Sequence, residues 1–148
     1  MSSEKKANVT KSVEMETLPA DPVATVRQFV ACINAGDVAG LAALMTEDHR
    51  FLDATGAIHA GREAMIQGWR HYFEGFPDYR IEMEDAIAQE NHVALFGWAS
   101  GSFQGNPERA WRIPGAWRAV VSDGRIAEWR VYADIEPMVR STGVTREW

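Results

Sequence analysis

Asp53 is the residue whose type and setting most directly suggest chemistry. It stands in the segment EDHRFLDATG, residues 47–56, just before a Thr-Gly turn. Strand alternation places its carboxylate on the same face as Phe51, opposite Arg50 and Leu52. Two interpretations are open: an Asp that forms its own turn, or a carboxylate at the mouth of an apolar pocket. In a pocket, we expect burial to raise the pKa of Asp53 and make it a better base near neutral pH.

Asp134 is the second candidate base, in the segment RVYADIEP near the C-terminal end. Alternation puts Asp134 on the face opposite Trp129, Val131 and Ala133. If the Trp129 face lines a pocket, Asp134 reaches that pocket only where a bulge or the strand end redirects it. The alternatives are an ion pair with Arg130 and a cap at the end of the strand.

Aromatic and basic side chains are the candidates for lining such a pocket. The sequence has six Trp, a high count for 148 residues, and aromatic side chains often line sites for apolar ligands. Taken singly, each Trp in the C-terminal half of the chain is expected in the core or at a dimer face. We nevertheless expect at least one of them to contact a ligand. Arg112 would stabilise an oxyanion, or be solvated or paired across strands. His59 would lie at the rim or in a plain loop. The candidates are Trp98, Trp117, Trp129, Arg112, His59 and Tyr72.

Helices must position these groups in the first half of the chain. Asp21 and Pro22 mark a helix start, and apolar residues then recur with helical spacing as far as residue 33. Asp37 caps a second, shorter helix, and the candidate strand covers residues 49–53. The segment ATGAIHAG reads as a loop, and a third amphipathic helix covers residues 62–73.

Strand patterns replace helical ones after residue 78. The predicted strands cover residues 79–89, 92–103, 109–121 and 125–134. Asp123 and Gly124 are a strong signal for a tight hairpin. This order of elements predicts an α+β fold, in which a long, curved antiparallel sheet wraps around three helices and forms a cone with an open end. Aromatic residues on both sheet faces favour a homodimer through the outer face.

Composition excludes several classes of partner. The net charge is −6 and no Lys/Arg cluster stands out, which argues against nucleic acid or an anionic membrane. The single Cys32 allows no intramolecular disulfide and is expected to be buried. The four His lack the spacing of zinc sites, so no metal is expected.

The N-terminal segment is polar and carries no signal-peptide or membrane-span pattern, so a cytoplasmic location is expected. Residues 1–20 mix charged and small polar side chains without a sustained period. They are predicted to be a disordered or loosely docked arm. Residues 21–148 are predicted to form a single domain.

Two long segments of this chain resemble a known superfamily. The first half, FVACINAGDVAGLAALMTEDHRFLDATGAIHAGREAMI, resembles the opening of nuclear transport factor 2-like proteins. The segments HVALFGWASGSFQG and VVSDGRIAEWRVYADIEPMV resemble their closing strands. Within the superfamily, the pattern is most similar to the SnoaL-like branch, which includes polyketide cyclases. The resemblance covers roughly residues 22–140 and implies the NTF2-like cone, a fold that hosts several activities.

The resemblance also implies roles for individual residues. Asp53 matches the place of the general-base Asp of ketosteroid isomerases, and Asp134 matches the acid of SnoaL-type cyclases. Phe29, expected in the pocket, stands where the isomerases carry an oxyanion-hole Tyr. Phe29 cannot donate a hydrogen bond, and loss of one such donor costs about 2.7–4 kcal/mol, so steroid-type isomerisation is disfavoured.

The function predicted from the sequence is a small-molecule pocket protein. If it is catalytic, it would be a cyclase, isomerase or dehydratase that needs no cofactor. Asp134 and Asp53 would then abstract a proton next to the carbonyl of a hydrophobic or aromatic substrate. The alternative is a ligand-binding or accessory module of the same fold without turnover, which the missing oxyanion donors favour.

Overall fold

A computed structural model describes residues 21–143 of the chain. The prediction of an N-terminal arm over residues 1–20 lies outside the described residues. The described part contains four α-helices: α2 (Pro22–Ala35), α3 (Val38–Leu44), α4 (Arg62–Gly75) and α5 (Glu136–Ser141). It also contains six strands: β1 (Met45–Leu52), β2 (Ile58–Ala60), β3 (Arg80–Gln89), β4 (His92–Ser102), β5 (Ala110–Ser122) and β6 (Arg125–Tyr132).

Local signals fix the ends of the first two helices. The side chain of Asp21 accepts a hydrogen bond from the backbone N–H of Val23 at 3.0 Å. Gly36 ends α2 in the left-handed conformation, with φ of 63°, which glycine adopts without strain. Asp37 then caps α3 by accepting from the N–H of Gly40 at 2.9 Å. Both aspartates act as the sequence predicts.

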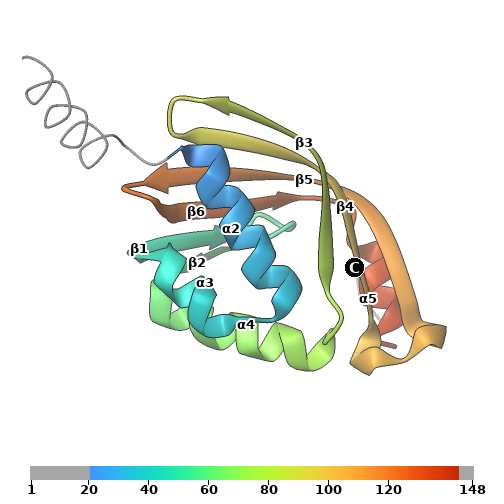
Figure 1. Ribbon diagram of the computed structural model, residues 1–148. Coiled ribbons are helices and arrows are strands. Elements are labelled where there is room, and N and C mark those ends of the chain that lie inside the picture. Colours follow the sequence, from blue (N-terminus) through green and yellow to red (C-terminus); the bar gives the residue numbers. More distant parts are fainter. Residues whose placement is uncertain (1–20, 144–148) are drawn as a thin grey trace, which may run out of the picture.

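The sheet is mixed, with the strand order β2-β1-β6-β5-β4-β3. All neighbouring strands are antiparallel except β1 and β6, which are parallel. The sheet curves around α2, and α4 and α5 lie at its open end (Figure 1). The predicted α+β cone is therefore confirmed. The parallel pair was not predicted, because it joins strands from opposite ends of the chain.

The core fills the narrow part of the cone. Phe29 of α2 is completely buried, and its ring lies 5.0 Å from that of Trp129 on β6. Along β5, odd-numbered residues such as Trp117 and Ala119 are buried, so the odd face of this strand points inward. Cys32 is only partly buried, whereas a fully buried side chain was expected.

Two local expectations differ from the structure. The segment expected to be a loop between β1 and α4 contains β2, and Phe51 pairs with His59 there. β1 begins at Met45, before the predicted strand of residues 49–53. After β6, the chain forms α5. The predicted hairpin between β5 and β6 is present, with positive φ at both Asp123 and Gly124.

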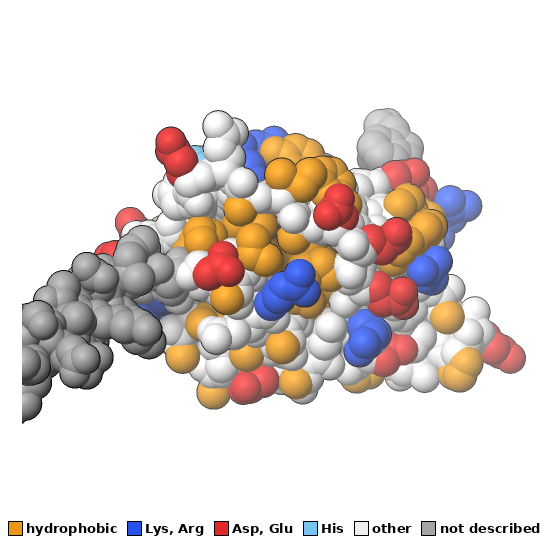
Figure 2. Space-filling view, turned by 45° about the horizontal axis from the view of Figure 1, so that its top comes forward, with side chains coloured by type: hydrophobic (Ala, Val, Ile, Leu, Met, Phe, Trp, Pro, Cys, Tyr) orange, Lys and Arg blue, Asp and Glu red, His pale blue; other side chains and the backbone are white. Residues whose placement is uncertain are grey.

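Charge is dispersed on the surface. On the face shown in Figure 2, acidic and basic side chains lie interspersed, with hydrophobic side chains between them. No described helix is long and apolar enough to cross a membrane.

Candidate functional site

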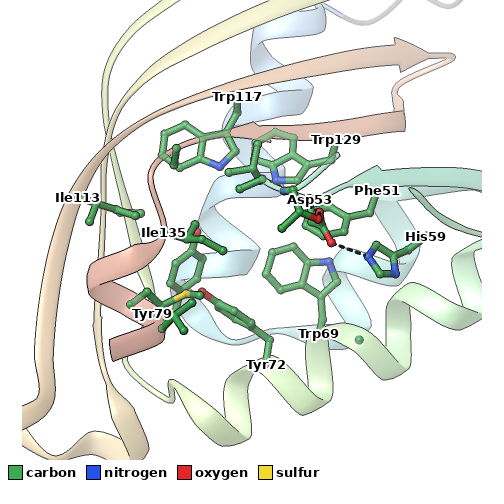
Figure 3. Close-up of a pocket in the computed structure, with 18 of the residues that line it drawn as sticks. Phe51, Asp53, His59, Trp69, Tyr72, Tyr79, Ile113, Trp117, Trp129 and Ile135 are labelled. Carbon is green, nitrogen blue, oxygen red and sulfur yellow. Dashed lines mark hydrogen bonds and ion pairs between the residues drawn. The ribbon is translucent and has the colours of Figure 1, made fainter. Parts of the chain in front are cut away.

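A cavity of about 470 Å³ opens between the concave face of the sheet and helices α4 and α5 (Figure 3). Its wall is mainly aromatic and aliphatic. The lining residues include Phe51, Asp53, Thr55, His59, Met65, Trp69, Tyr72, Tyr79, Trp111, Ile113, Trp117, Trp129, Val131, Ile135, Met138 and Val139. This volume and lining are typical of a site for a small organic ligand.

The aromatic rings of the wall hold one another in place. Trp69 meets Tyr72 edge-on, with ring centroids 6.1 Å apart and planes at 84°. Tyr72 in turn meets Tyr79 at 4.9 Å and 85°, and Tyr79 lies 6.0 Å from Trp111. Edge-to-face contacts of this kind are favourable and geometrically specific. The rings therefore form a pre-organised wall built from α4, β5 and the turn before β3.

Asp53 and His59 form a pair at one side of the cavity. Oδ2 of Asp53 lies 3.0 Å from Nε2 of His59, and both residues line the cavity (Figure 3). Oδ1 of Asp53 accepts from the N–H and hydroxyl of Thr55 at 2.9 and 2.6 Å, and from the N–H of Ala57 at 3.1 Å. Asp53 thus forms its own turn and also faces the cavity.

The pKa of Asp53 is lower than its ordinary value. Partial burial acts to raise it, but the hydrogen bonds from His59, Thr55 and Ala57 stabilise the anion and together outweigh burial. The expectation of a raised pKa is therefore wrong, because the turn supplies donors that the pocket argument left out. Asp53 is ionised at neutral pH and is a weak base.

The ionised carboxylate decides which nitrogen of His59 carries hydrogen. A carboxylate only accepts hydrogen bonds, so Nε2 of His59 is the donor in this pair. In the neutral imidazole, Nδ1 then keeps a free lone pair that can accept a proton. The arrangement corresponds to an imidazole base oriented by a carboxylate, which is the pairing that general-base catalysis by histidine uses.

Two partly buried tyrosines, Tyr72 and Tyr79, contribute further polar groups to the wall. Burial raises the pKa of both Tyr72 and Tyr79, because an ionised phenolate loses its hydration there. Both side chains therefore stay neutral. The hydroxyl of Tyr72 donates to Sδ of Met138 at 3.2 Å, which joins α4 to α5 across the cavity.

Asp134, the other predicted base, lies outside the cavity. It is exposed, and its Oδ1 accepts from the backbone N–H of Glu136 at 3.1 Å. β6 ends at Tyr132, so no bulge turns Asp134 inward. The cap at the strand end, one of the alternatives from the sequence, is the arrangement found.

Three predicted pocket residues also lie elsewhere. Phe29 is fully buried behind Trp69 and Trp129 and does not line the cavity. Trp98 and Arg112 lie on the outer face of the sheet, where the guanidinium group stacks over the indole at 3.9 Å. Even-numbered residues of β4 and β5 point outward, and this parity explains both misplacements.

The residues missed by sequence reasoning belong to the same wall. Trp69 and Tyr79 line the cavity, as do Trp111 on β5 and Met138 on α5. Trp111 could have been selected, because it is six residues from Trp117 and shares its strand face. Met138 follows the last strand and carried no signal. Among the described residues, no group of three or more His, Cys, Asp or Glu side chains is arranged to hold a metal ion.

Comparison with protein families decides the classification. The family model for the SnoaL-like domain matches residues 26–129. The chain belongs to the SnoaL-like domain family. The match spans α2 to β6, and therefore includes both Asp53 and His59. A comparison with curated proteins gave no match.

Solved structures of similar fold come from several bacteria. One, from Catenulispora acidiphila, has a ketosteroid isomerase-like fold and was solved in complex with trimethylamine. It is 19% identical to this SnoaL-like chain, and the match covers 84% of this chain and 95% of the other, with a TM-score of 0.72. IdmH from Streptomyces antibioticus, a candidate polyketide cyclase, is 25% identical, with coverage of 84% and 99% and a TM-score of 0.69. A candidate SnoaL-like polyketide cyclase from Jannaschia sp. CCS1 is 18% identical, with coverage of 88% and 96% and a TM-score of 0.73. These likenesses establish the fold, which carries more than one activity.

Proposed function

We propose that this SnoaL-like protein binds a hydrophobic or aromatic carbonyl compound in its cavity and catalyses proton transfer at the carbon next to the carbonyl. The observation that carries the proposal is the Asp53–His59 pair, with 3.0 Å between Oδ2 and Nε2, in the wall of an aromatic cavity. Isomerisation, dehydration and aldol-type cyclisation all begin with this proton transfer. Polyketide cyclase activity, named for the similar IdmH, falls in the same class.

In this proposal the two residues have different roles. Nδ1 of His59 accepts the proton from the substrate and later returns it, as a general base and then a general acid. Asp53 holds the imidazole in the required tautomer and stabilises the imidazolium that forms, which is the function of a carboxylate beside a catalytic histidine. The lowered pKa of Asp53 suits it to this supporting role, because it remains an anion.

An enolate needs hydrogen-bond donors near its oxygen. Three residues of the wall, Trp69, Trp111 and Trp117, have buried indole N–H groups without a hydrogen-bond partner among the described residues. A buried donor without a partner costs about 1–3 kcal/mol. Because these nitrogen atoms are themselves buried in the wall, a substrate oxygen would accept a hydrogen bond from one of them only after its indole ring turns toward the cavity.

Deuterium exchange tests the proposed proton transfer. The probe is 2-tetralone, a bicyclic ketone, incubated in D₂O and followed by proton NMR at the carbons next to its carbonyl. We expect wild type to accelerate exchange over buffer, and His59→Gln to lose about 10²–10⁴-fold of that rate. Asp53→Asn should also slow exchange, because the imidazole loses its anionic partner.

Two variants control for indirect effects. Asp134→Asn alters an exposed acid outside the cavity, and His92→Gln alters an exposed histidine at the start of β4; both should exchange at the wild-type rate. If wild type binds 2-tetralone but exchange is no faster than in buffer, catalysis is refuted and the alternative, a ligand-binding module without turnover, holds.

We also propose that the protein forms a homodimer through the outer face of the sheet. Phe96, Ala116 and Tyr132 lie side by side across β4, β5 and β6, and Phe96 and Tyr132 are 43% and 45% exposed. Together with Trp98 they form what we call the outer-face patch. Large exposed apolar side chains gathered on one face favour association.

A further inference from the structure

The charge balance of the cavity wall is one-sided. Asp53 is the carboxylate in the wall, and none of the described residues that line the cavity is Lys or Arg. Oδ1 of Asp53 accepts three hydrogen bonds, whereas Oδ2 accepts one, from His59. Oδ2 therefore keeps acceptor capacity, and the side chain is 29% exposed. A ligand in the cavity meets an accessible negative charge.

The aromatic rings of the wall also favour a positively charged ligand. Four indoles and two phenols line the cavity: Trp69, Trp111, Trp117, Trp129, Tyr72 and Tyr79. The face of an aromatic ring is the negative end of its quadrupole, and indole attracts cations most strongly. The rings are fixed by contacts with one another, so binding a ligand costs little ordering of the wall.

We infer that the cavity selects a ligand that carries a positively charged ammonium group, held over the indole rings and balanced by Asp53. This inference rests on the proposed function only in using the same cavity as a ligand site, and it adds the charge of the ligand. Burial of an ammonium group is costly unless other groups compensate for its lost hydration. The rings and the carboxylate provide that compensation, whereas an anion would meet no Lys or Arg side chain among the described residues of the lining.

The overall charge acts in the same direction. The chain carries a formal net charge of −6, which raises the local concentration of cations and speeds their association. Trp69, Trp129 and Asp53 all line the cavity (Figure 3). The carboxylate and these two indole rings thus border the same cavity, in which the ammonium group would sit.

A pair of ligands of equal shape tests the inference. The probes are (4-hydroxyphenyl)trimethylammonium and 4-tert-butylphenol, which differ by nitrogen in place of carbon, titrated separately by calorimetry. We expect the cation to bind wild type at least about tenfold more tightly, as for desolvated ammonium over indole. This comparison needs no variant. If 4-tert-butylphenol binds as tightly as the cation, or if neither binds, the inference is overturned.

Variants then assign the effect to the carboxylate. Asp53→Asn removes the charge and keeps the shape, so it should weaken binding of the cation while leaving 4-tert-butylphenol within about twofold. Asp134→Asn removes a charge outside the cavity and should change neither. His59→Gln should keep the preference for the cation although it abolishes proton exchange in 2-tetralone. Loss of exchange with intact selectivity for the cation separates the two proposals, and equal weakening of both probes by Asp53→Asn contradicts the role given to the carboxylate.

Discussion

His49 is an ionisable residue in a completely buried position of β1. Its Nδ1 donates to the backbone carbonyl of Ile126 on β6 at 2.7 Å, and its Nε2 has no partner among the described residues. Burial lowers the pKa of His49, against the opposing effects of the Ile126 carbonyl and of the carboxylates of Asp48 and Glu128. The folded protein therefore holds this imidazole neutral.

Acid should destabilise the fold through His49. In the unfolded chain the imidazole gains its proton near pH 6.5, while in the folded chain it resists protonation until a lower pH. The stabilisation is thus present above pH 6.5 and is lost as the pH falls below that value toward the folded-state pKa. We expect the free energy of unfolding, measured in urea, to decrease from pH 8 to pH 5.5 in wild type.

His49→Gln should reduce this decrease, whereas His92→Gln, at an exposed histidine, should leave it unchanged. If wild type and His49→Gln lose equal stability over the same pH interval, the assignment to His49 is wrong.

At the scale of single residues, the sequence predicted positions better than chemical states. Alternation put Phe51 and Asp53 on one face, and both line the cavity. From the sequence, forming a turn and lining a pocket were alternative roles for Asp53, yet in the structure Asp53 does both. Because His59, Thr55 and Ala57 donate hydrogen bonds that stabilise the anion, the pKa of Asp53 lies below its ordinary value instead of above it.

Gly97 is required because the backbone of β3 lies close to it on β4. The register of this strand pair shifts between Met83 and Asp85, and a Cβ atom on Gly97 would lie 1.9 Å from the carbonyl oxygen of Glu82. We expect Gly97→Ala to reduce the free energy of unfolding by about 1–3 kcal/mol or more, as for other overpacked sites. Equilibrium unfolding in urea measures this loss.

Gly75→Ala is the matched control, because nothing lies within 4 Å of a Cβ atom at that position, the last of α4. It should be neutral or stabilising by up to about 1 kcal/mol. If Gly97→Ala and wild type unfold at the same urea concentration, β3 and β4 can move apart at little cost in free energy, and the prediction is wrong.

At the scale of elements, local patterns predicted most helices and strands but few of their partners. Caps at Asp21 and Asp37 located two helices, and alternation located β3 to β6. β2 has only three residues, all exposed, and therefore carried no apolar pattern. Trp98 was assigned to the pocket because its strand was recognised but its inward face was not. That choice depends on pairing and bulges, which are tertiary features.

For the whole molecule, the outer-face patch predicts the state of assembly. Lys in place of Phe96 or Tyr132 would add positive charge beside Arg118 and Arg130, which pair across β5 and β6, and would remove apolar contact area. We expect wild type to be a dimer by light scattering after gel filtration, and Phe96→Lys combined with Tyr132→Lys to be a monomer. Ile58→Lys, at a 54% exposed position on β2, should stay dimeric. A wild-type monomer at micromolar concentration would disprove the dimer.

The position of β6 between β1 and β5 has a consequence for synthesis of the chain. β1 supplies Phe51, and β6 supplies Trp129 and Val131, to one continuous wall. A nascent polypeptide that has left the ribosome only as far as β5 lacks the strand that joins the two halves, so it cannot enclose a guest molecule. Contacts between such distant segments form slowly, and a guest would stabilise the completed protein alone, not its partly synthesised precursors.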